Sequence, residues 1–297
     1  MILYYALGGG LGHIARSFAL IEHAPRPIRS RIRILVSSSA APAAEPGFPC
    51  PVDRVPDGAM SHTGRYKNFL VDYFGKHRFR CIVMDTFPFG LLSEMKYVMP
   101  RLPRILVARY LRWNAYLDMC GGINDAVWPE GAVIIEEQDS MYSDALRNNC
   151  FLAMARWPVS PARPREISPS SGKTACCIVH SGPKEEIDQL TGLARRVMAE
   201  KRIPGLPRVL TPDDGIFPAE RHLSGFSDIV TGAGYASCAS AALLKGKIRY
   251  HLHPFHRRFD DQSLRLERLK SGFWMDDKPG SSSEAAGILW DLVGIHA

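Results

Sequence analysis

The chain has 297 residues, a net charge of +7 and 46% hydrophobic residues. This composition excludes a disordered chain, and the length favours two domains of about 120 to 150 residues over one small core. No apolar run reaches the roughly 20 residues of a membrane span, and the N-terminus lacks a basic leader, so we expect a cytoplasmic protein. The seven cysteines have no CxxC spacing, which indicates reduced thiols and no metal site. The positive charge favours an anionic ligand, but no nucleic-acid recognition motif accompanies the scattered arginines.

The first half of the chain alternates apolar runs with amphipathic segments. A strand is expected at residues 1–7, and apolar residues at helical spacing predict a helix over 14–24. Further strands are expected at 31–38, 80–87 and 103–111, with a helix at 66–77. This alternation predicts a parallel α/β sheet.

A proline- and serine-rich segment, WPVSPARPREISPSSG at 157–172, interrupts this pattern. We therefore expect one domain over 1–158, a second over 173–297 and a linker at about 159–172. The second half repeats the alternation, with expected strands at 174–182, 207–214, 226–234 and 247–254 and helices at 184–200 and 235–246. Both domains are thus expected to be α/β.

The first glycine loop, LGGGLGHIAR at 7–16, joins the first strand to the first helix. Glycines let backbone N–H groups approach a ligand, and the positive end of the following helix favours an anion. The dinucleotide pattern GxGxxG fails, because His13 occupies the position of its last glycine. A histidine titrates near neutral pH and suits proton transfer, so His13 is a candidate general base. A ligand-free turn, with His13 bonded to backbone, is the structural alternative.

A second glycine loop lies in DIVTGAGYASCASAALLKGKIRYHLHPFHRRFDDQ, residues 228–262. Its glycines open a helix of small residues, and an Asp–Gln pair ends the segment. A carboxylate beside an amide offers acceptors and donors suited to the adjacent hydroxyls of a sugar.

Together the two glycine loops and the Asp–Gln pair resemble the GT-B glycosyltransferases. The resemblance is strongest to the branch that contains the lipid II-forming N-acetylglucosaminyltransferase and the macrolide and plant glucosyltransferases. It covers both halves of the chain in the right order. It implies an α/β fold of two Rossmann-like domains whose parallel sheets face a central cleft, with the acceptor on the first domain and the nucleotide sugar on the second.

The same resemblance assigns roles to individual residues. His13 would be catalytic, deprotonating an acceptor hydroxyl or orienting a water. The acceptor loop would comprise Gly9, Gly10, Gly12, Arg16 and Asp85. The donor-binding residues would be His180, Ser181, Gly182, Gly232, Gly234, Tyr235, Ser237, Arg257, Arg258, Asp261 and Gln262.

Two positions depart from the family pattern. Ser240 stands where the family usually has a ribose-binding glutamate, and Gly232 replaces the histidine common before the glycine loop. The two arginines Arg257 and Arg258 could supply charge to a diphosphate instead, although a solvated loop explains them equally well. The donor's nucleobase and sugar are therefore not assigned.

Three acidic residues follow apolar runs. Asp85 ends an expected strand, where ligands of α/β sheets gather, and a helix cap is its structural alternative. Glu136 and Glu137 follow the run AVII and are expected in a solvated loop.

The resemblance thus implies an enzyme that transfers a sugar from a nucleotide-diphosphate sugar to a hydroxyl, and we expect no tightly bound metal or cofactor. Its expected partners are the nucleotide sugar as co-substrate and a small-molecule, glycan or lipid acceptor, and a lipid acceptor would imply peripheral membrane contact. One alternative is hydrolysis of a nucleotide sugar, because a small GT-B-like hydrolase of bacterial sialic-acid-like sugar synthesis carries a similar GxGHxxR loop. The other is a non-catalytic nucleotide-sugar-binding protein.

Overall fold

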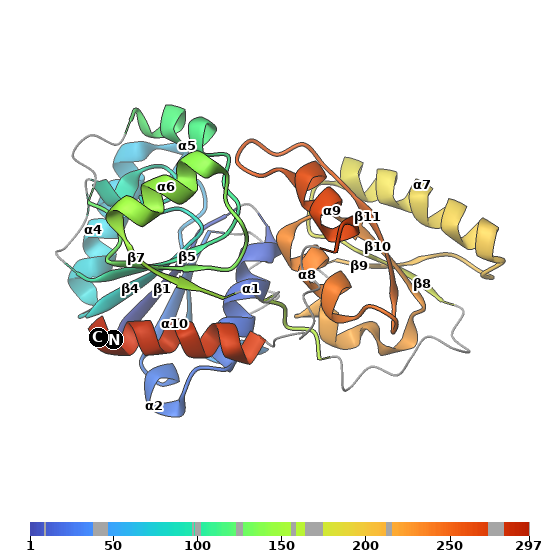
Figure 1. Ribbon diagram of the computed structural model, residues 1–297, viewed down its shortest axis with the longest axis horizontal. Coiled ribbons are helices and arrows are strands. Elements are labelled where there is room, and N and C mark those ends of the chain that lie inside the picture. The colour runs from blue at the N-terminus through green and yellow to red at the C-terminus, as the bar shows by residue number, and fades with distance from the viewer. Residues whose placement is uncertain are drawn as a thin grey trace.

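Two parallel β-sheets form the framework of the protein, one in each half of the chain (Figure 1). The computed structural model describes residues 1–8, 10–37, 47–96, 98, 102–122, 127–155, 159–163, 175–211, 216–272 and 282–296. Strand order is β3-β2-β1-β4-β5-β6-β7 in the first sheet and β11-β10-β8-β9 in the second. Every strand pair is parallel, which confirms the expected α/β class.

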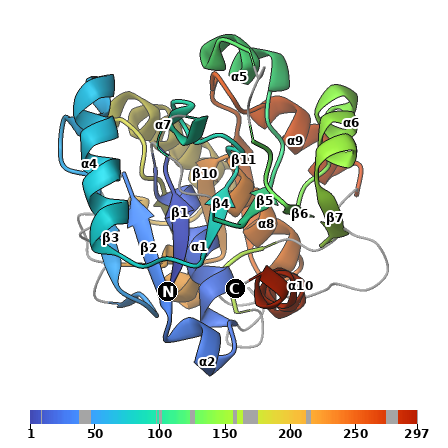
Figure 2. The ribbon, with the colours of Figure 1, turned by 90° about the vertical axis from the view of Figure 1, so that its left-hand side faces the viewer.

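The first domain contains β1 (Ile2–Ala6), α1 (Leu11–Glu22), α2 (Arg26–Arg29), β2 (Ile32–Val36), β3 (Val52–Arg54), α4 (Thr63–Lys76), β4 (Cys81–Asp85), β5 (Arg104–Ala108), α5 (Trp113–Cys120), β6 (Gly131–Ile134), α6 (Ser140–Asn149) and β7 (Phe151–Met154). Helices cover both faces of its sheet (Figure 2). In β1, Ile2 and Tyr4 pack on one face, whereas Leu3 and Tyr5 pack on the other. Burial on both faces explains why these strands are continuous apolar runs in the sequence.

The second domain contains β8 (Cys176–Val179), α7 (Lys184–Lys201), β9 (Arg208–Leu210), β10 (Asp228–Gly232), α8 (Tyr235–Leu243), β11 (Arg249–His253) and α9 (Gln262–Lys270). Its central strands, β8 and β10, are also buried on both faces. Ile178 packs under Leu190 and Ala194 of α7, and Ile229 packs on the opposite face with Leu244. No helix in the part of the chain that the structure describes is long and apolar enough to cross a membrane.

The last helix, α10 (Ser282–His296), belongs to the first domain, although the expected boundaries place it with the second. It packs beside α1 and against β4, β5 and β6 (Figures 1 and 2). Trp290 is 1% exposed and donates from its indole N–H to the Leu20 carbonyl at 2.8 Å. The buried apolar face of α10 therefore completes the core of the first sheet.

The chain thus crosses between the domains twice, at neighbouring places. In the first crossing, part of the expected linker is described: Val159 and Ser160 are buried. Ser160 N–H donates to Ser282 Oγ at 3.0 Å, and Ser282 Oγ donates to the Ser160 carbonyl at 2.7 Å. These two hydrogen bonds tie the outgoing and returning segments together. Residues 164–172 of the expected linker lie outside the described residues.

Candidate functional site

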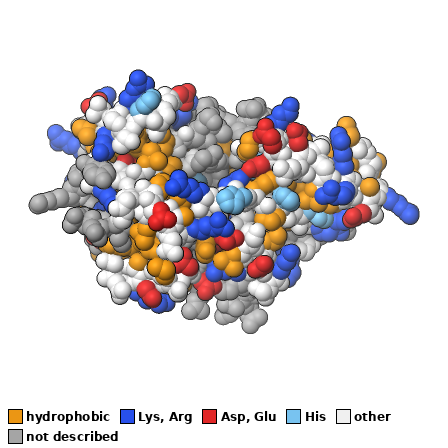
Figure 3. Space-filling view, turned by 90° about the horizontal axis from the view of Figure 1, so that it is seen from above, with side chains coloured by type: hydrophobic (Ala, Val, Ile, Leu, Met, Phe, Trp, Pro, Cys, Tyr) orange, Lys and Arg blue, Asp and Glu red, His pale blue; other side chains and the backbone are white. Residues whose placement is uncertain are grey.

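A cavity of about 540 Å³ lies between the two domains. Loops after β1, β4 and β5 line it from the first domain, and loops after β8, β9 and β10 line it from the second. In open α/β sheets, ligands bind at the carboxyl ends of the strands, next to points where the strand order reverses. Figure 3 shows arginine, lysine and histidine side chains on the face where the two halves meet. The cavity is therefore the candidate active site.

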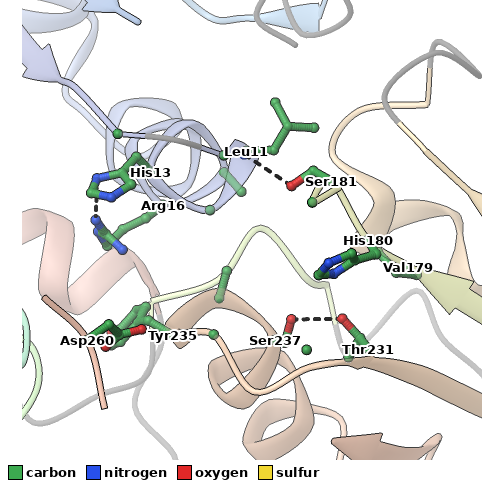
Figure 4. A pocket seen from close by; sticks show the side chains of 18 of the residues that line it. Leu11, His13, Arg16, Val179, His180, Ser181, Thr231, Tyr235, Ser237 and Asp260 are labelled. Atoms are coloured by element: carbon green, nitrogen blue, oxygen red, sulfur yellow. Dashed lines mark hydrogen bonds between the residues drawn. The ribbon is translucent and has the colours of Figure 1, made fainter. Parts of the chain in front are cut away.

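His13, on the first turn of α1, lines the cavity and is held from behind by Asp85 at the end of β4. His13 Nδ1 forms a close contact with Asp85 Oδ2. Arg16, one turn further along α1, donates from Nε to Asp85 Oδ1 at 2.8 Å, and its Nη2 also contacts this carboxylate. Figure 4 shows His13 and Arg16 side by side at the wall of the cavity. Nδ1 faces Asp85 and also lies 3.3 Å from Arg16 Nη2, while the imidazole itself lines the cavity.

Burial and charge set the protonation of this group. Burial lowers the pKa of His13, and this effect outweighs the opposing influence of Asp85. For Asp85, burial disfavours the carboxylate, but the Arg16 charge and the bonds from His13 and Arg16 hold its pKa well below the usual range. A neutral imidazole held by an ionised aspartate is the arrangement that a general base requires at neutral pH.

The glycine loop makes room for this imidazole. A Cβ atom on Gly8 would overlap the ring of His13, whereas one on Gly12 would meet nothing within 4 Å. Gly10 is the N-cap of α1, in extended backbone, and lines the cavity beside Gly12. Gly9 lies outside the described residues. Gly8 was not expected in the site, because a close approach between residues five apart depends on the turn and the rotamer rather than on a sequence motif.

Aromatic side chains form an apolar wall next to His13. Phe87 stacks against the imidazole with ring centroids 6.0 Å apart and an interplanar angle of 17°. Phe259, from the second domain, meets Phe87 edge-on at 5.9 Å. Leu91 also lines this part of the cavity. These side chains make the part of the cavity wall next to His13 apolar.

Two helix N-termini without side-chain caps meet at the cavity. Neither α1 nor α8 has a side-chain cap hydrogen bond or an acidic residue in its first turn. The second-domain loop through Gly232 and Gly234 leads into α8, and Ser237 on its first turn bonds to Thr231 at 3.1 Å between hydroxyl oxygens (Figure 4). The positive end of the helix dipole and the N–H groups of a first turn favour an anion at these ends.

Ser181 and Tyr235 link the domains at the edges of the cavity. Leu11 N–H, at the start of α1, donates to Ser181 Oγ at 3.3 Å (Figure 4). Tyr235, expected at a diphosphate, accepts from Val159 N–H at 3.1 Å, and its ring packs 5.3 Å from the Arg16 guanidinium carbon. Tyr235 lines the cavity with its ring, while its hydroxyl serves the connection between domains.

His180 and Arg257 share one carboxylate on the second-domain side. Glu186, on the first turn of α7, receives a bond from His180 Nε2 at 2.7 Å and two bonds from Arg257 at 2.6 Å. Burial is the largest influence on the pKa of His180 and lowers it, against the effect of Glu186. A Cβ on Gly182 would overlap both His180 and Glu186, so the glycine is required for this packing. Since Glu186 neutralises Arg257, the exposed Arg258 is the more available cation at the cavity wall.

The Asp–Gln pair does not present two side chains to the cavity. Asp261 caps α9, accepting from Leu264 N–H at 3.0 Å, and pairs with Arg112 at 2.9 Å. Gln262 lines the cavity but is 7% exposed, and its Oε1 accepts the Phe255 N–H at 2.9 Å.

Ser240 and Glu136 both lie in buried polar contacts. Ser240 is buried and bonded to Ser160 at 2.7 Å between hydroxyl oxygens, so it belongs to the domain connection. The expectation of a solvated Glu136 is wrong, because it follows the buried strand β6 and forms an ion pair with Arg265 at 2.7 Å. Glu137, beside it, is exposed as expected. Within the described residues, no group of three or more histidine, cysteine or acidic side chains could hold a metal ion.

Comparisons with known proteins rest on structure. No protein-family model and no curated protein sequence matches this chain. The glycosyltransferase SsfS6 of Streptomyces sp. SF2575, complexed with thymidine diphosphate, matches with a TM-score of 0.53 and 12% identity over 99% of this chain and 96% of that one. A putative UDP-N-acetylglucosamine 2-epimerase from Listeria monocytogenes matches at 0.57 and 8%, over 99% and 96%. Staphylococcus aureus MnaA, in a structure with UDP, matches at 0.56 and 9%, over 99% and 87%.

At such low identity these likenesses establish the fold alone. The protein has the GT-B fold, with two parallel-sheet domains around an interdomain cavity. The expectation for the fold class is confirmed. The more specific resemblance to the lipid II-forming branch remains a prediction.

Proposed function

We propose that this protein is a glycosyltransferase that moves a sugar from a nucleotide-diphosphate sugar to a hydroxyl acceptor. The observation that carries the proposal is the buried His13–Asp85 pair, which faces a cavity shared with the uncapped start of α8. A base and an anion site on opposite sides of one cavity are what this reaction needs. The GT-B neighbours that contain TDP or UDP support a nucleotide-diphosphate ligand.

In the proposed reaction, His13 Nε2 takes the proton of the acceptor hydroxyl as its oxygen bonds to the anomeric carbon of the donor. The bond from that carbon to the diphosphate oxygen breaks, and the nucleoside diphosphate leaves with the electron pair. Asp85 keeps the proton of His13 on Nδ1 and stabilises the imidazolium that forms. The free hydroxyl is thereby exchanged for a glycosidic bond, and the proton remains on His13 until it is released to solvent.

On the donor side, we propose that the N–H groups at the start of α8, with Gly232, Gly234 and Ser237, bind the diphosphate. Arg258 adds positive charge as the leaving group departs, which is the role that a metal ion fills in other transferases. His180, Ser181 and Gly182 line the same side. On this proposal Arg257 acts indirectly, because Glu186 already holds its guanidinium.

Thermal unfolding in the presence of nucleotides tests the donor side. UDP, TDP, GDP, ADP and CMP are compared in parallel, because a ligand that binds the folded state at 100 times its Kd stabilises it by about 2.7 kcal/mol. Ser237→Ala should weaken the response to the active nucleotide, whereas Asp85→Asn should retain it. If no nucleotide raises the unfolding temperature at millimolar concentration, the donor site is wrongly placed.

Assays of sugar release test the chemistry. With the donor identified, His13→Ala should reduce turnover by about 10²- to 10⁴-fold, the usual contribution of a general base, while nucleotide binding persists. Sugar release that requires an added acceptor supports transfer. Release without any acceptor would indicate hydrolysis by a water that His13 activates, and binding without turnover would indicate the non-catalytic alternative.

A further inference from the structure

A continuous series of polar contacts joins the second domain to the His13–Asp85 pair. It begins at Asp260, on the segment before α9, which is 8% exposed. Asp260 Oδ1 accepts from Arg109 Nη1 at 2.9 Å, and Oδ2 accepts from Arg265 Nη1 at 3.0 Å. Asp260 is therefore a buried carboxylate from one domain that holds an arginine of the other.

Arg109 follows β5 and carries the series into the first domain. Its Nε donates to Thr86 Oγ1 at 3.1 Å, so a single guanidinium contacts both Asp260 and Thr86. A guanidinium is planar and presents its donors in a fixed arrangement, so movement of one acceptor turns the whole group. The position of Arg109 thus depends on the second domain.

Thr86 carries the series on to Asp85. It is fully buried and has a φ of +74°, a left-handed conformation that is strongly disfavoured for a β-branched residue. This backbone places Thr86 Oγ1 between two guanidinium groups, because Arg16 Nη2 also donates to it at 3.0 Å. Such strain persists only where surrounding contacts fix it, and it concentrates at functional sites. Arg16 in turn holds Asp85 through Nε.

We infer that Arg109 is a positioning residue that makes the orientation of Asp85, and with it the tautomer of His13, depend on the docked second domain. This inference rests on the proposed role of His13 as the base. In the docked arrangement, Asp260 fixes Arg109, and Arg109 and Arg16 both donate to Thr86 Oγ1. Arg16 then holds the Asp85 carboxylate, and His13 keeps its proton on Nδ1. Without Asp260, the contacts around Thr86 loosen and the imidazole exchanges between its two tautomers.

Arg112 provides a matched control. It also lies just after β5, and it pairs with the neighbouring aspartate, Asp261, at the same N···O distance of 2.9 Å. Its side chain also bonds to the Arg257 carbonyl of the second domain at 3.4 Å. The bonds found for the Arg112 guanidinium all lead to the second domain, in contrast to those of Arg109.

The test is ¹⁵N NMR of the imidazole nitrogens in the full chain, without any ligand. We expect the Nδ1–H tautomer of His13 in the parent and in Arg112→Lys. Arg109→Lys keeps the charge but replaces the two nitrogens that contact Thr86 and Asp260 with one, which loses the fixed spacing of the guanidinium. Asp260→Asn removes the charge that holds Arg109. Both should therefore show a mixture of tautomers. Thr86→Ser should behave as the parent, whereas Thr86→Gly, which relieves the left-handed strain and removes the hydroxyl, should behave as Arg109→Lys.

The possible results separate this inference from the proposed function. If the parent shows the Nδ1–H form and Arg109→Lys and Thr86→Gly retain it, the inference is overturned and the base remains. If the parent lacks that form, the His13–Asp85 arrangement behind both proposals is wrong. Once a donor is known, the inference also expects Arg109→Lys to lower kcat by about 10- to 100-fold with unchanged nucleotide Kd, because small misplacements of catalytic groups have effects of this size.

Discussion

The fit between Gly8 and the imidazole of His13 leaves no space for a methyl group. We expect Gly8→Ala to displace the ring from Asp85. Gly8 follows β1 and His13 lies on α1, so the new methyl group is accommodated most easily by a rotation of the His13 side chain. The substitution should lower turnover at least as strongly as an Asp85→Asn change. It should also lower the free energy of unfolding by about 1–3 kcal/mol, the usual effect of overpacking. Urea denaturation and His13 NMR would measure the two effects.

Gly12→Ala is the control for that substitution, because a Cβ at Gly12 meets open space. It should not lower the stability, because alanine is favoured over glycine in a helix, and it should leave the His13 spectrum as in the parent. A parent-like spectrum in Gly8→Ala would show that the ring has another way to reach Asp85, contrary to the packing described above.

The pH dependence of the site follows from the lowered pKa of His13, which burial causes. The unfolded chain, with a histidine pKa of about 6.5, binds this proton more readily than the folded chain does. Stability should therefore fall as the pH drops from about 6.5 toward the lower folded pKa, and should stay level above 6.5. The acidic limb of the activity profile should lie below pH 6.5 for the same reason. Urea denaturation as a function of pH, in the parent and in His13→Gln, isolates this contribution, and a profile unchanged by His13→Gln would contradict it.

At the scale of elements, α10 stabilises a sheet whose strands lie far from it in the sequence. Trp290→Ala removes a fully buried side chain and its bond to the Leu20 carbonyl. We expect a loss of about 3–5 kcal/mol in the free energy of unfolding, measured by urea denaturation. On the same helix, Ile295 is 76% exposed, so Ile295→Ala should change stability by less than about 0.5 kcal/mol. Equal effects of the two substitutions would show that α10 is not held as described.

The elements that were predicted from sequence share one property, which is a clear local pattern of apolar residues. Strands β1, β4 and β5 are continuous apolar runs, and α1 and α7 have clear helical spacing, so local pattern was enough. The strand β6 was missed because its residues, Gly131–Ile134, form a short run that begins with glycine. That glycine makes room for α10, since a Cβ there would lie 2.8 Å from Leu292. No local pattern reports a contact between residues so far apart.

The site shows the same division. The glycine loop and His13, which line the cavity, could be singled out because one short segment carries the whole signal. The environments of Glu136 and Asp261 could not be predicted, because their partners, Arg265 and Arg112, are distant in sequence. An acidic residue after an apolar run gives no indication whether water or an arginine will meet it. The donor role of Asp261 remains a prediction that its present ion pair does not support.

At the scale of the whole molecule, buried ion pairs hold the two domains together. Arg265 of the second domain is 1% exposed and bonds to both Glu136 and Asp260. Glu136→Gln removes one of the negative charges that neutralise Arg265. Removing one partner of a buried ion pair lowers the free energy of unfolding by about 3–5 kcal/mol. The adjacent Glu137, which is exposed and 3.8 Å from Arg268, offers a control, because Glu137→Gln should cost less than about 1 kcal/mol.

Urea denaturation followed by tryptophan fluorescence would measure the stability lost in Glu136→Gln and in Glu137→Gln. We expect Glu136→Gln to shift the whole transition, because residues of α8 and of the first sheet belong to one continuous core. A separate transition at lower urea concentration would mean that the two domains separate before either of them unfolds. Similar midpoints for Glu136→Gln and Glu137→Gln would mean that the buried pair contributes little.

The return of α10 to the first domain also constrains how the chain is made. On the ribosome, β4, β5 and β6 emerge long before residues 282–296, and the entire second domain is translated in between. At 5–20 residues per second this delay is on the order of 10 s. Throughout that time the nascent first domain exposes the apolar surface that Trp290 and Leu289 later cover. The first domain is therefore synthesised first but completed last, and its early form is the stage at which a chaperone would be needed.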